Sequence, residues 1–150
     1  MPTVHRTISS PAGPQTVHAY LADFENATEW DHGTVSCERT SGEGGPGTTY
    51  RNVSRFGGRE VEVEYTTIRT DPPAAASGTG VVELVGRNGS TTLNDTMTVR
   101  PGPDGGTLVE YEAVLSLSGV MRLATPVMAL LFGRLADKTE RTMTDALARL

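Results

Sequence analysis

One stretch, Glu60–Tyr65 (EVEVEY), sets the structural class of this chain, because its residues alternate between carboxylates and apolar side chains. Successive side chains of a β-strand point to opposite faces, so the alternation predicts a strand with one face in solvent and one against a core. Such a strand is typical of an antiparallel sheet. We extend it to Arg59–Arg69, between the turn residues Gly57-Gly58 and Asp71-Pro72-Pro73.

Further stretches with strand character lie on both sides of Glu60–Tyr65. Connectors with turn chemistry separate them, among them Asn88-Gly89 and the segment Gly102–Gly106. Consecutive strands joined by tight turns, with no helix between them, predict a meander. The expected strands are Thr3–Ile8, Val35–Arg39, Thr48–Phe56, Arg59–Arg69, Ala74–Arg87, Ser90–Arg100 and Thr107–Ser118.

The residues between the first two strands predict two short helices. Pro14 suits the first turn of a helix, and apolar residues follow it at helical spacing, namely Val17, Tyr20, Leu21 and Phe24. Asp23 is placed to cap a second short turn through Asn26, which leads to Trp30.

The C-terminal segment predicts a long helix, with Thr125 as the N-cap and Pro126 at the first helical position. Between Val120 and Phe132 apolar side chains surround the helix axis. This part must therefore be covered on several sides or line a mouth that a ligand or partner covers. From Val127 onward most charged residues lie off one apolar face of the helix, which is formed by Val127, Leu131, Leu135, Met143 and Leu147.

Together these elements predict the α+β class, with a curved sheet of seven strands that buries its concave face against the C-terminal helix. The chain has 150 residues and no long linker, so we expect a single domain over residues 1–150. A sheet and one helix do not close tightly at both ends. A cavity between them is therefore expected.

Charge and hydropathy exclude two classes of partner. The net charge is −5 and the basic residues are scattered, which argues against nucleic-acid binding. The most apolar segment, Val120–Phe132, is shorter than the roughly 20 residues of a bilayer span, and the N-terminus lacks a signal-peptide pattern. We therefore expect a cytoplasmic protein without an integral membrane segment, either a monomer or a homodimer.

The sequence also contains no pattern that would hold a cofactor or metal ion. Gly42, Gly44 and Gly47 spell G-x-G-x-x-G, but a strand rather than a helix follows, so a hairpin loop is favoured over a dinucleotide site. The three histidines lie too far apart for a local metal motif. The lone Cys37 is expected to be a buried, inert thiol. We predict no cofactor and no metal.

Several short motifs occur in a characteristic order along the chain: Ile8–Ala12, Val17–Asn26, Glu29–Asp31, Gly47–Tyr50, Gly106–Tyr111 and Gly119–Pro126. In this combination the chain resembles the START/Bet v 1-like (SRPBCC) superfamily, specifically bacterial polyketide cyclase/dehydrase-like proteins. The resemblance covers essentially the whole chain. It implies a helix-grip fold, in which the seven-stranded sheet wraps around the long C-terminal helix. Because the superfamily hosts carriers, lipid-transfer domains, sensors and cyclases, it indicates a fold rather than a reaction.

Asp95 is the candidate catalytic residue. It shares a strand face with Leu93, Met97 and Val99, where desolvation would raise its pKa and suit it to act as an acid or as a hydrogen-bond acceptor. Two other interpretations stay open: a bulge that turns Asp95 outward, or an arginine that pairs with it.

Aromatic and amide side chains on neighbouring strand faces are the candidate ligand contacts. Phe56, beside Gly57-Gly58, is placed to act as a gate. The alternative for each tyrosine is a plain core position with its hydroxyl at the surface. The expected ligand-binding residues are Tyr50, Asn52, Phe56, Tyr65, Met97, Tyr111, Leu115 and Leu131.

Three functions remain open. The first, which we favour because the polar residues are few, is binding of a small hydrophobic molecule such as a lipid, polyketide or isoprenoid. The second is a polyketide cyclase or aromatase that folds a poly-β-ketone chain, assisted by Asp95, Tyr50, Asn52 and Tyr111. The third is a protein-interaction or quinone-chaperone role through the apolar segment Val120–Phe132.

Overall fold

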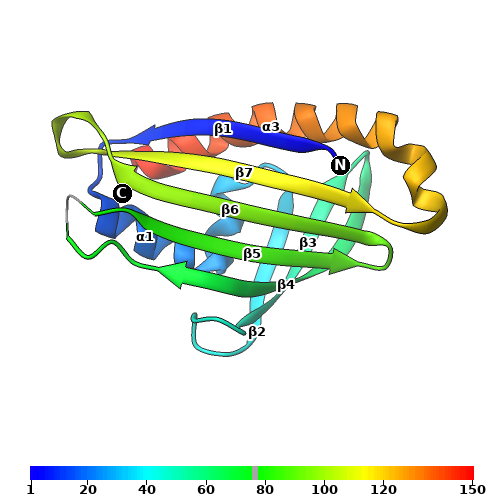
Figure 1. The fold of residues 1–150 in the computed structure, drawn as a ribbon, viewed down its shortest axis with the longest axis horizontal. Helices are drawn as coiled ribbons and strands as arrows, with labels where there is room; N and C mark the ends of the chain where they lie inside the picture. Colours follow the sequence, from blue (N-terminus) through cyan, green and yellow to red (C-terminus); the bar gives the residue numbers. More distant parts are fainter. Residues whose placement is uncertain (76–77) are drawn as a thin grey trace.

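The computed structural model describes residues 1–75 and 78–150, and within them seven strands form one antiparallel sheet (Figure 1). The strands are ordered β1-β7-β6-β5-β4-β3-β2, so the first and second strands form its two edges. This architecture confirms the predicted class. The strands are β1 (Thr3–Ser10), β2 (Thr34–Ser41), β3 (Thr49–Phe56), β4 (Arg59–Asp71), β5 (Gly80–Asn88), β6 (Thr91–Pro101) and β7 (Thr107–Leu117).

The strand expected at Ala74–Arg87 begins later than the sequence pattern suggests. β5 starts at Gly80, because the chain bends at Ala74 and Ala75 directly after Pro72-Pro73. Ala76 and Ser77, which the prediction included, lie outside the described residues.

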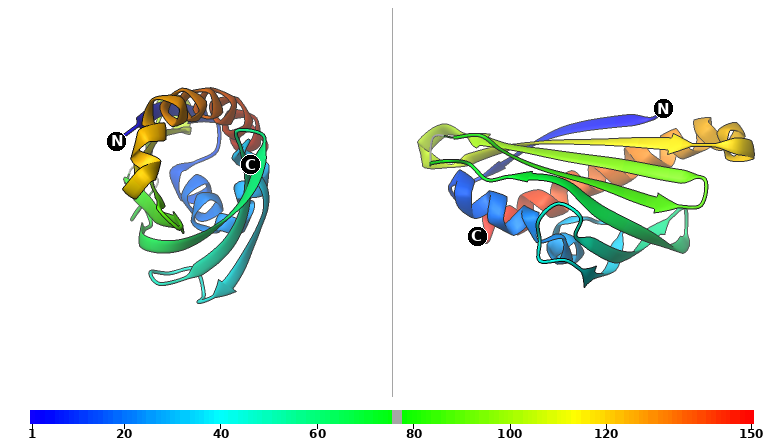
Figure 2. Two further views of the ribbon diagram at one scale, coloured as in Figure 1. Left: turned by 90° about the vertical axis from the view of Figure 1, so that its right-hand side faces the viewer. Right: turned by 60° about the horizontal axis from the view of Figure 1, so that its bottom comes forward.

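The helices fall into two groups. α1 (Pro14–Ala22), the 3-10 turn η1 (Phe24–Asn26) and α2 (Ala27–Trp30) lie between the first two strands, as predicted. η2 (Pro103–Gly105) sits in the β6–β7 connection, and η3 (Gly119–Ala124) leads directly into α3 (Thr125–Ala148). Figure 2 shows the sheet curling around α1 and α2 while α3 runs along the β1 edge. The long helix therefore contacts both β1 and α2 and closes the open side of the sheet.

Register shifts account for part of the sheet's curvature. They occur in β2 between Thr34 and Ser36 and again between Arg39 and Ser41, and in β4 between Thr67 and Arg69. An extra residue in one strand bends it and increases its twist. In β4 the predicted alternation holds at Val63 and Tyr65, which are buried while Glu62 and Glu64 face solvent, but Val61 is exposed.

The start of α3 differs from the prediction. Ala124, not Thr125, occupies the N-cap position, and the Thr125 hydroxyl donates to the Arg122 carbonyl at 2.7 Å. The helix has this start because η3 runs directly into it, so that Ala124, the last residue of η3, takes the position before the first residue of α3. Burial along the predicted apolar face of the C-terminal helix is not uniform either, because Met143 and Leu147 are fully buried while Val127 is exposed.

At one end of the concave face the core is solid. Phe24 packs edge-on against Trp30 and Tyr50, with ring centroids 6.0 and 5.6 Å apart. Trp30 is fully buried and serves as a core anchor. Cys37 is also buried, and burial raises the pKa of its thiol to about 12, so it stays protonated and unreactive.

Candidate ligand cavity

A cavity of about 380 Å³ lies between the concave face of the sheet and the first half of α3. Aliphatic and aromatic side chains from β4, β6, β7 and α3 form most of its wall. Residues of the β3–β4 and β5–β6 hairpins and of η3 line one end, and several of them are exposed, so the opening lies there. The wall includes Val63, Leu93, Leu115, Phe132, Leu135 and Ala136, and the open end includes Phe56, Arg59, Asn88, Thr91, Met121 and Met128.

Asp95 lines this cavity from the middle of β6, opposite Leu84 and Ala113 of the neighbouring strands. Its side chain is only 5% exposed, and within the described residues it forms no hydrogen bond or ion pair. Burial, and secondarily the charge of Asp31, raises its pKa to about 8. Near neutral pH this carboxyl group is therefore mostly protonated and can donate a proton or a hydrogen bond.

Tyr65 on β4 and Tyr111 on β7 line the same cavity. Burial raises the pKa of both phenols, and the nearby Asp95 and Asp31 raise it further. Both hydroxyls stay protonated, and in the described structure neither donates to another residue. Together with Asp95 they present three polar groups that the described residues leave without partners.

Asp31, which sequence reasoning did not select, is the second carboxylate of the cavity. It follows α2, and the hydroxyl of Thr34 donates to its Oδ2 at 2.8 Å. The backbone N–H of Gly33 and the hydroxyl of Thr139 donate to its Oδ1 at 3.1 and 3.2 Å. Burial raises the pKa of Asp31, and these three donors partly offset that rise. The two carboxyl groups therefore differ: Asp31 is held by donors and Asp95 is not.

A chain of side-chain hydrogen bonds extends from Asp31 across the β2–β3 edge. Thr34 accepts a hydrogen bond from Asn52 Nδ2 at 3.0 Å, and Ser54, which lines the cavity, donates to Asn52 Oδ1. Asn52 thus sits behind the cavity wall. It fixes the orientation of Thr34 and Ser54.

The predicted ligand contacts divide into two sets. Phe56, Tyr65, Tyr111 and Leu115 line the cavity together with Asp95, whereas Tyr50, Asn52, Met97 and Leu131 are not among its lining residues.

Each residue of the second set lies outside the cavity lining for a structural reason. Tyr50 and Met97 belong to the solid core, where Phe24 and the short helices fill the concave face. Asn52 lies in the hydrogen-bonded chain behind the wall. Leu131 points toward the β3–β4 turn, with its Cδ1 3.3 Å from the position that a Cβ on Gly57 would take.

The described residues were also compared with the requirements of a metal site and of a membrane-spanning helix. They contain no group of three or more histidine, cysteine or acidic side chains placed to hold a metal ion. One helix among them, Gly119–Ala148, is long and apolar enough to cross a membrane by length and composition, which is weak evidence by itself. Its C-terminal half packs against the core through Met143 and Leu147, whereas only 11% of its apolar window is buried.

Comparison with known proteins supports the resemblance noted in the sequence. Residues 1–150 match the family model described as polyketide cyclase/dehydrase and lipid transport. No curated protein sequence matches the chain.

Solved structures of the same fold are numerous but distant in sequence. A START superfamily protein from Mycobacterium smegmatis has a TM-score of 0.70 and 16% identity, over 97% of this chain and 96% of its own. An aromatase/cyclase from Streptomyces sp. R1128 has a TM-score of 0.68 and 12% identity, over 97% and 90%. A STAR-related lipid transfer protein from Xanthomonas axonopodis has a TM-score of 0.68 and 17% identity, over 97% and 85%. At these identities the similarity establishes the fold alone.

Proposed function

Because the chain belongs to the family of polyketide cyclases, dehydrases and lipid-transport proteins, we propose that its cavity binds a small apolar molecule that carries oxygen atoms. One observation carries this proposal. In an otherwise apolar wall, Asp95, Tyr65 and Tyr111 present polar groups that no described residue satisfies. Small-molecule sites have this composition, with apolar walls and a few convergent polar groups.

The chemistry of the three groups favours a hydrogen-bond acceptor on the ligand. A protonated carboxyl group and two phenols each offer one O–H donor. Desolvated polar groups without partners cost free energy, so a carbonyl or hydroxyl oxygen that accepts from them would be selected over a plain hydrocarbon. The cavity volume of about 380 Å³ lies within the range of small-molecule pockets.

Native mass spectrometry of the protein purified from its own host tests this proposal directly. We expect a co-purifying apolar molecule that contains oxygen. Titration with an aromatic polyketide (emodin), a fatty acid (palmitate) and an isoprenoid alcohol (farnesol) then identifies the preferred class. If nothing co-purifies and none of the three binds, the proposal is wrong.

Removal of single hydroxyl groups tests which atoms take part. Tyr65→Phe and Tyr111→Phe should each weaken the preferred ligand about tenfold, since one hydrogen bond in a desolvated site is worth about 1.4 kcal/mol. Tyr20→Phe is the matched control, because its hydroxyl donates to Glu29 at 2.6 Å and does not line the cavity. Equal affinity of all three variants would contradict a polar anchor in the cavity.

A second candidate is catalysis of ring closure in a poly-β-ketone, and the contrast between the two carboxyl groups favours it. Residue pairs whose environments differ in this way commonly divide the roles of acid and base. Asp95 would protonate the carbonyl oxygen that is attacked, while Asp31 would accept the proton from the attacking α-carbon as the new C–C bond forms. No atom is lost in this addition.

Turnover of a soluble poly-β-ketone ester, followed by absorbance of the aromatic product that the cyclised adduct gives after it loses water, separates the two candidates. Asp95→Asn should reduce turnover by about two to four orders of magnitude if Asp95 is the acid, while binding stays close to that of the native protein. Unchanged turnover would leave binding as the function of the cavity.

A further inference from the structure

The outer surface of η3 and of the first turns of α3 is apolar although it is exposed to solvent. Val120 and Leu123 are 84% and 87% exposed, and Val127 and Leu130 are 63% and 56% exposed. Their spacing of three, four and three residues places them on one side of the helical segment. We call these four residues the apolar stripe.

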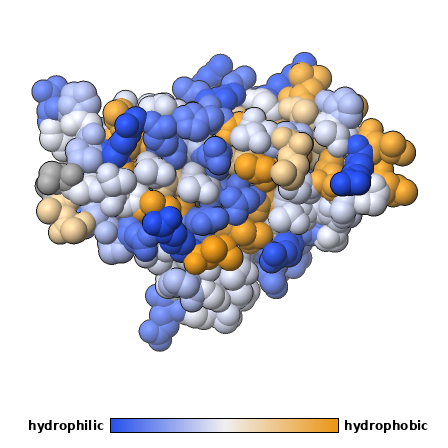
Figure 3. All heavy atoms as spheres, in the orientation of Figure 1, coloured by the Kyte–Doolittle hydropathy of each residue, from blue (hydrophilic) through white to orange (hydrophobic). Residues whose placement is uncertain are grey.

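The same segment has a second apolar side, which faces inward. Met121, Met128 and Phe132 line the cavity between α3 and the sheet. The outward stripe therefore contributes little to the packing of the described residues. Figure 3 shows hydrophobic surface gathered at this end of the molecule, over η3 and the start of α3.

Positive charge accompanies the stripe in a protein that is acidic as a whole. Residues 113–136 contain no aspartate or glutamate, but they contain Arg122 and Arg134, whereas the net charge of the chain is −5. Arg59, at the same end of the cavity, adds a third positive charge. In the part of the chain that the structure describes, none of these three arginines forms an ion pair.

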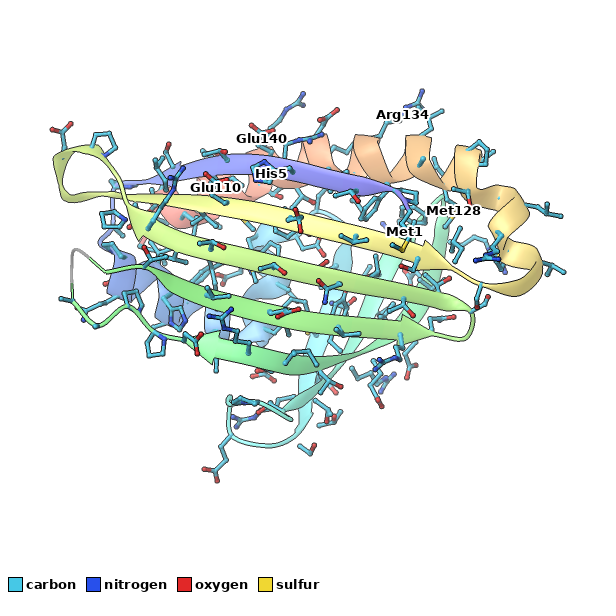
Figure 4. The ribbon with its side chains drawn as sticks, viewed as in Figure 1. Met1, His5, Glu110, Met128, Arg134 and Glu140 are labelled. Atoms are coloured by element: carbon cyan, nitrogen blue, oxygen red, sulfur yellow. The ribbon has the colours of Figure 1, made fainter. Side chains whose placement is uncertain are left out.

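The nearest acidic residues along α3 share a single arginine, which offsets one of their two negative charges. Asp137 and Glu140 pair with Arg6 at 2.7 and 3.3 Å. Figure 4 shows Arg134 projecting from the outer side of α3, with Met128 on the side toward the strands. Arg134 lies one turn beyond Leu130, so its aliphatic stem can lie along an apolar layer while the guanidinium reaches a charged one.

From this combination we infer that the apolar stripe docks on an anionic lipid surface. A segment with exposed aliphatic side chains, flanking arginines and no acidic residue fits the boundary between acyl chains and negative headgroups. The orientation places the open end of the cavity at the membrane, because Met121 and Met128 line the cavity next to the stripe. Docking requires no occupant in the cavity, so it can fail or succeed independently of the proposed ligand.

A protein partner fits this surface less well than a membrane. Four aliphatic side chains expose roughly 400 Å² in total, at about 100 Å² for each side chain. Stable protein interfaces bury at least about 1,200 Å² over both partners, or about 600 Å² on each, with good shape complementarity. Partition into a lipid surface needs no such complementarity and increases with each apolar side chain that enters.

Co-sedimentation of the full chain with vesicles tests the inference. One set of vesicles contains phosphatidylcholine only, and the other contains about one third phosphatidylglycerol, since anionic lipid attracts basic residues. We expect binding to the anionic vesicles that weakens with added salt, and little binding to phosphatidylcholine alone. A chain that stays in the supernatant with both sets overturns the inference.

Two double variants separate the apolar contribution from the electrostatic one. Leu123→Ser/Leu130→Ser should lower partition to the anionic vesicles at least tenfold, because two aliphatic side chains that would enter the lipid are lost. Arg122→Gln/Arg134→Gln should lower it roughly thirtyfold for the anionic vesicles only, at about 1 kcal/mol per charge. If the arginine variant keeps the full preference for anionic lipid, charge complementarity is not the cause and the inference is wrong.

Ile68→Ser provides the matched control, because Ile68 is 47% exposed on β4, away from the stripe. It should bind vesicles as the native chain does, and an equal loss would show that general hydrophobicity explains the result. Gel filtration of all variants tests a second copy as occupant. A native dimer that Leu123→Ser/Leu130→Ser converts to monomer would overturn docking on lipid.

Discussion

The two halves of α3 lie on the same sheet but meet different surroundings. In the C-terminal half, Met143, Ala146 and Leu147 are buried against the core. In the N-terminal half, Met128 and Leu135 border a cavity and Val127 faces solvent. One helix therefore serves as a core element at one end and as a cavity wall at the other.

The lengths of the elements explain this difference. The 11-residue strand β6 spans about 37 Å at about 3.4 Å per residue, whereas the 9-residue α1 spans about 14 Å. α1 and α2 fill the concave face only near Trp30 and Phe24. Beyond their reach the sheet and α3 continue without a third layer, and the cavity occupies that space.

The largest effect at the cavity end is expected in the pH dependence of the unfolding free energy. Asp95 ordinarily titrates at 3.8 and in the fold at about 8, so the folded state holds its proton more tightly than the unfolded state does. Its stabilising contribution is complete below pH 3.8 and is lost as pH rises to about 8, by up to about 1.4 kcal/mol per pH unit. Asp95→Asn should flatten this part of the curve, as urea unfolding at a series of pH values would show. A parallel decline in both proteins would mean that Asp95 is not desolvated.

Leucine truncation at the two ends of α3 compares packed and cavity-lining positions directly. Leu147→Ala should lower the unfolding free energy by about 3–4 kcal/mol, because it opens a void in a solid core. Leu135→Ala should cost only about 1–2 kcal/mol, because one side of Leu135 already faces the cavity. Chemical denaturation measures both, and equal costs would show that the cavity closes in solution.

The two carboxyl groups of the cavity should respond differently to the same substitution. Asp31→Asn should cost about 2 kcal/mol at neutral pH, since an amide cannot accept from Thr34, Gly33 and Thr139 as the carboxylate does. Asp95→Asn should raise the unfolding free energy at neutral pH, because the amide removes the cost of keeping a buried carboxyl group protonated and Asp95 has no partner to lose within the described structure. Thermal unfolding of both variants measures the difference. A larger loss for Asp95→Asn would reverse the assignment of the two roles.

The smallest effect is expected on the outer side of the same helix. Val127→Ser should change the unfolding free energy by less than about 0.5 kcal/mol, since Val127 is 63% exposed and contributes little to the core. A cost above about 1 kcal/mol would show that another part of the chain covers the apolar stripe in solution.

The local pattern was enough to predict the place of Asp95 on the apolar face of its strand, but it did not point to Asp31. Asp95 interrupts an apolar strand face, and the period of two places it on the concave side of the sheet. Asp31 follows a four-residue helix, where no period applies, and its partner Thr139 lies 108 residues away in the sequence. Only the folded chain brings the two together.

The order of elements and the buried face of each strand follow from short-range rules, because turn residues and hydrophobic period act over a few neighbouring positions. The alternation in Glu60–Tyr65 and the Asn88-Gly89 turn illustrate this. The depth of a residue along the concave face does not follow from them. Tyr50 and Tyr65 pair across β3 and β4, yet only Tyr65 lines the cavity. Whether such a position faces a cavity or a solid core depends on how far α1, α2 and α3 extend over the sheet, which is a property of long-range packing.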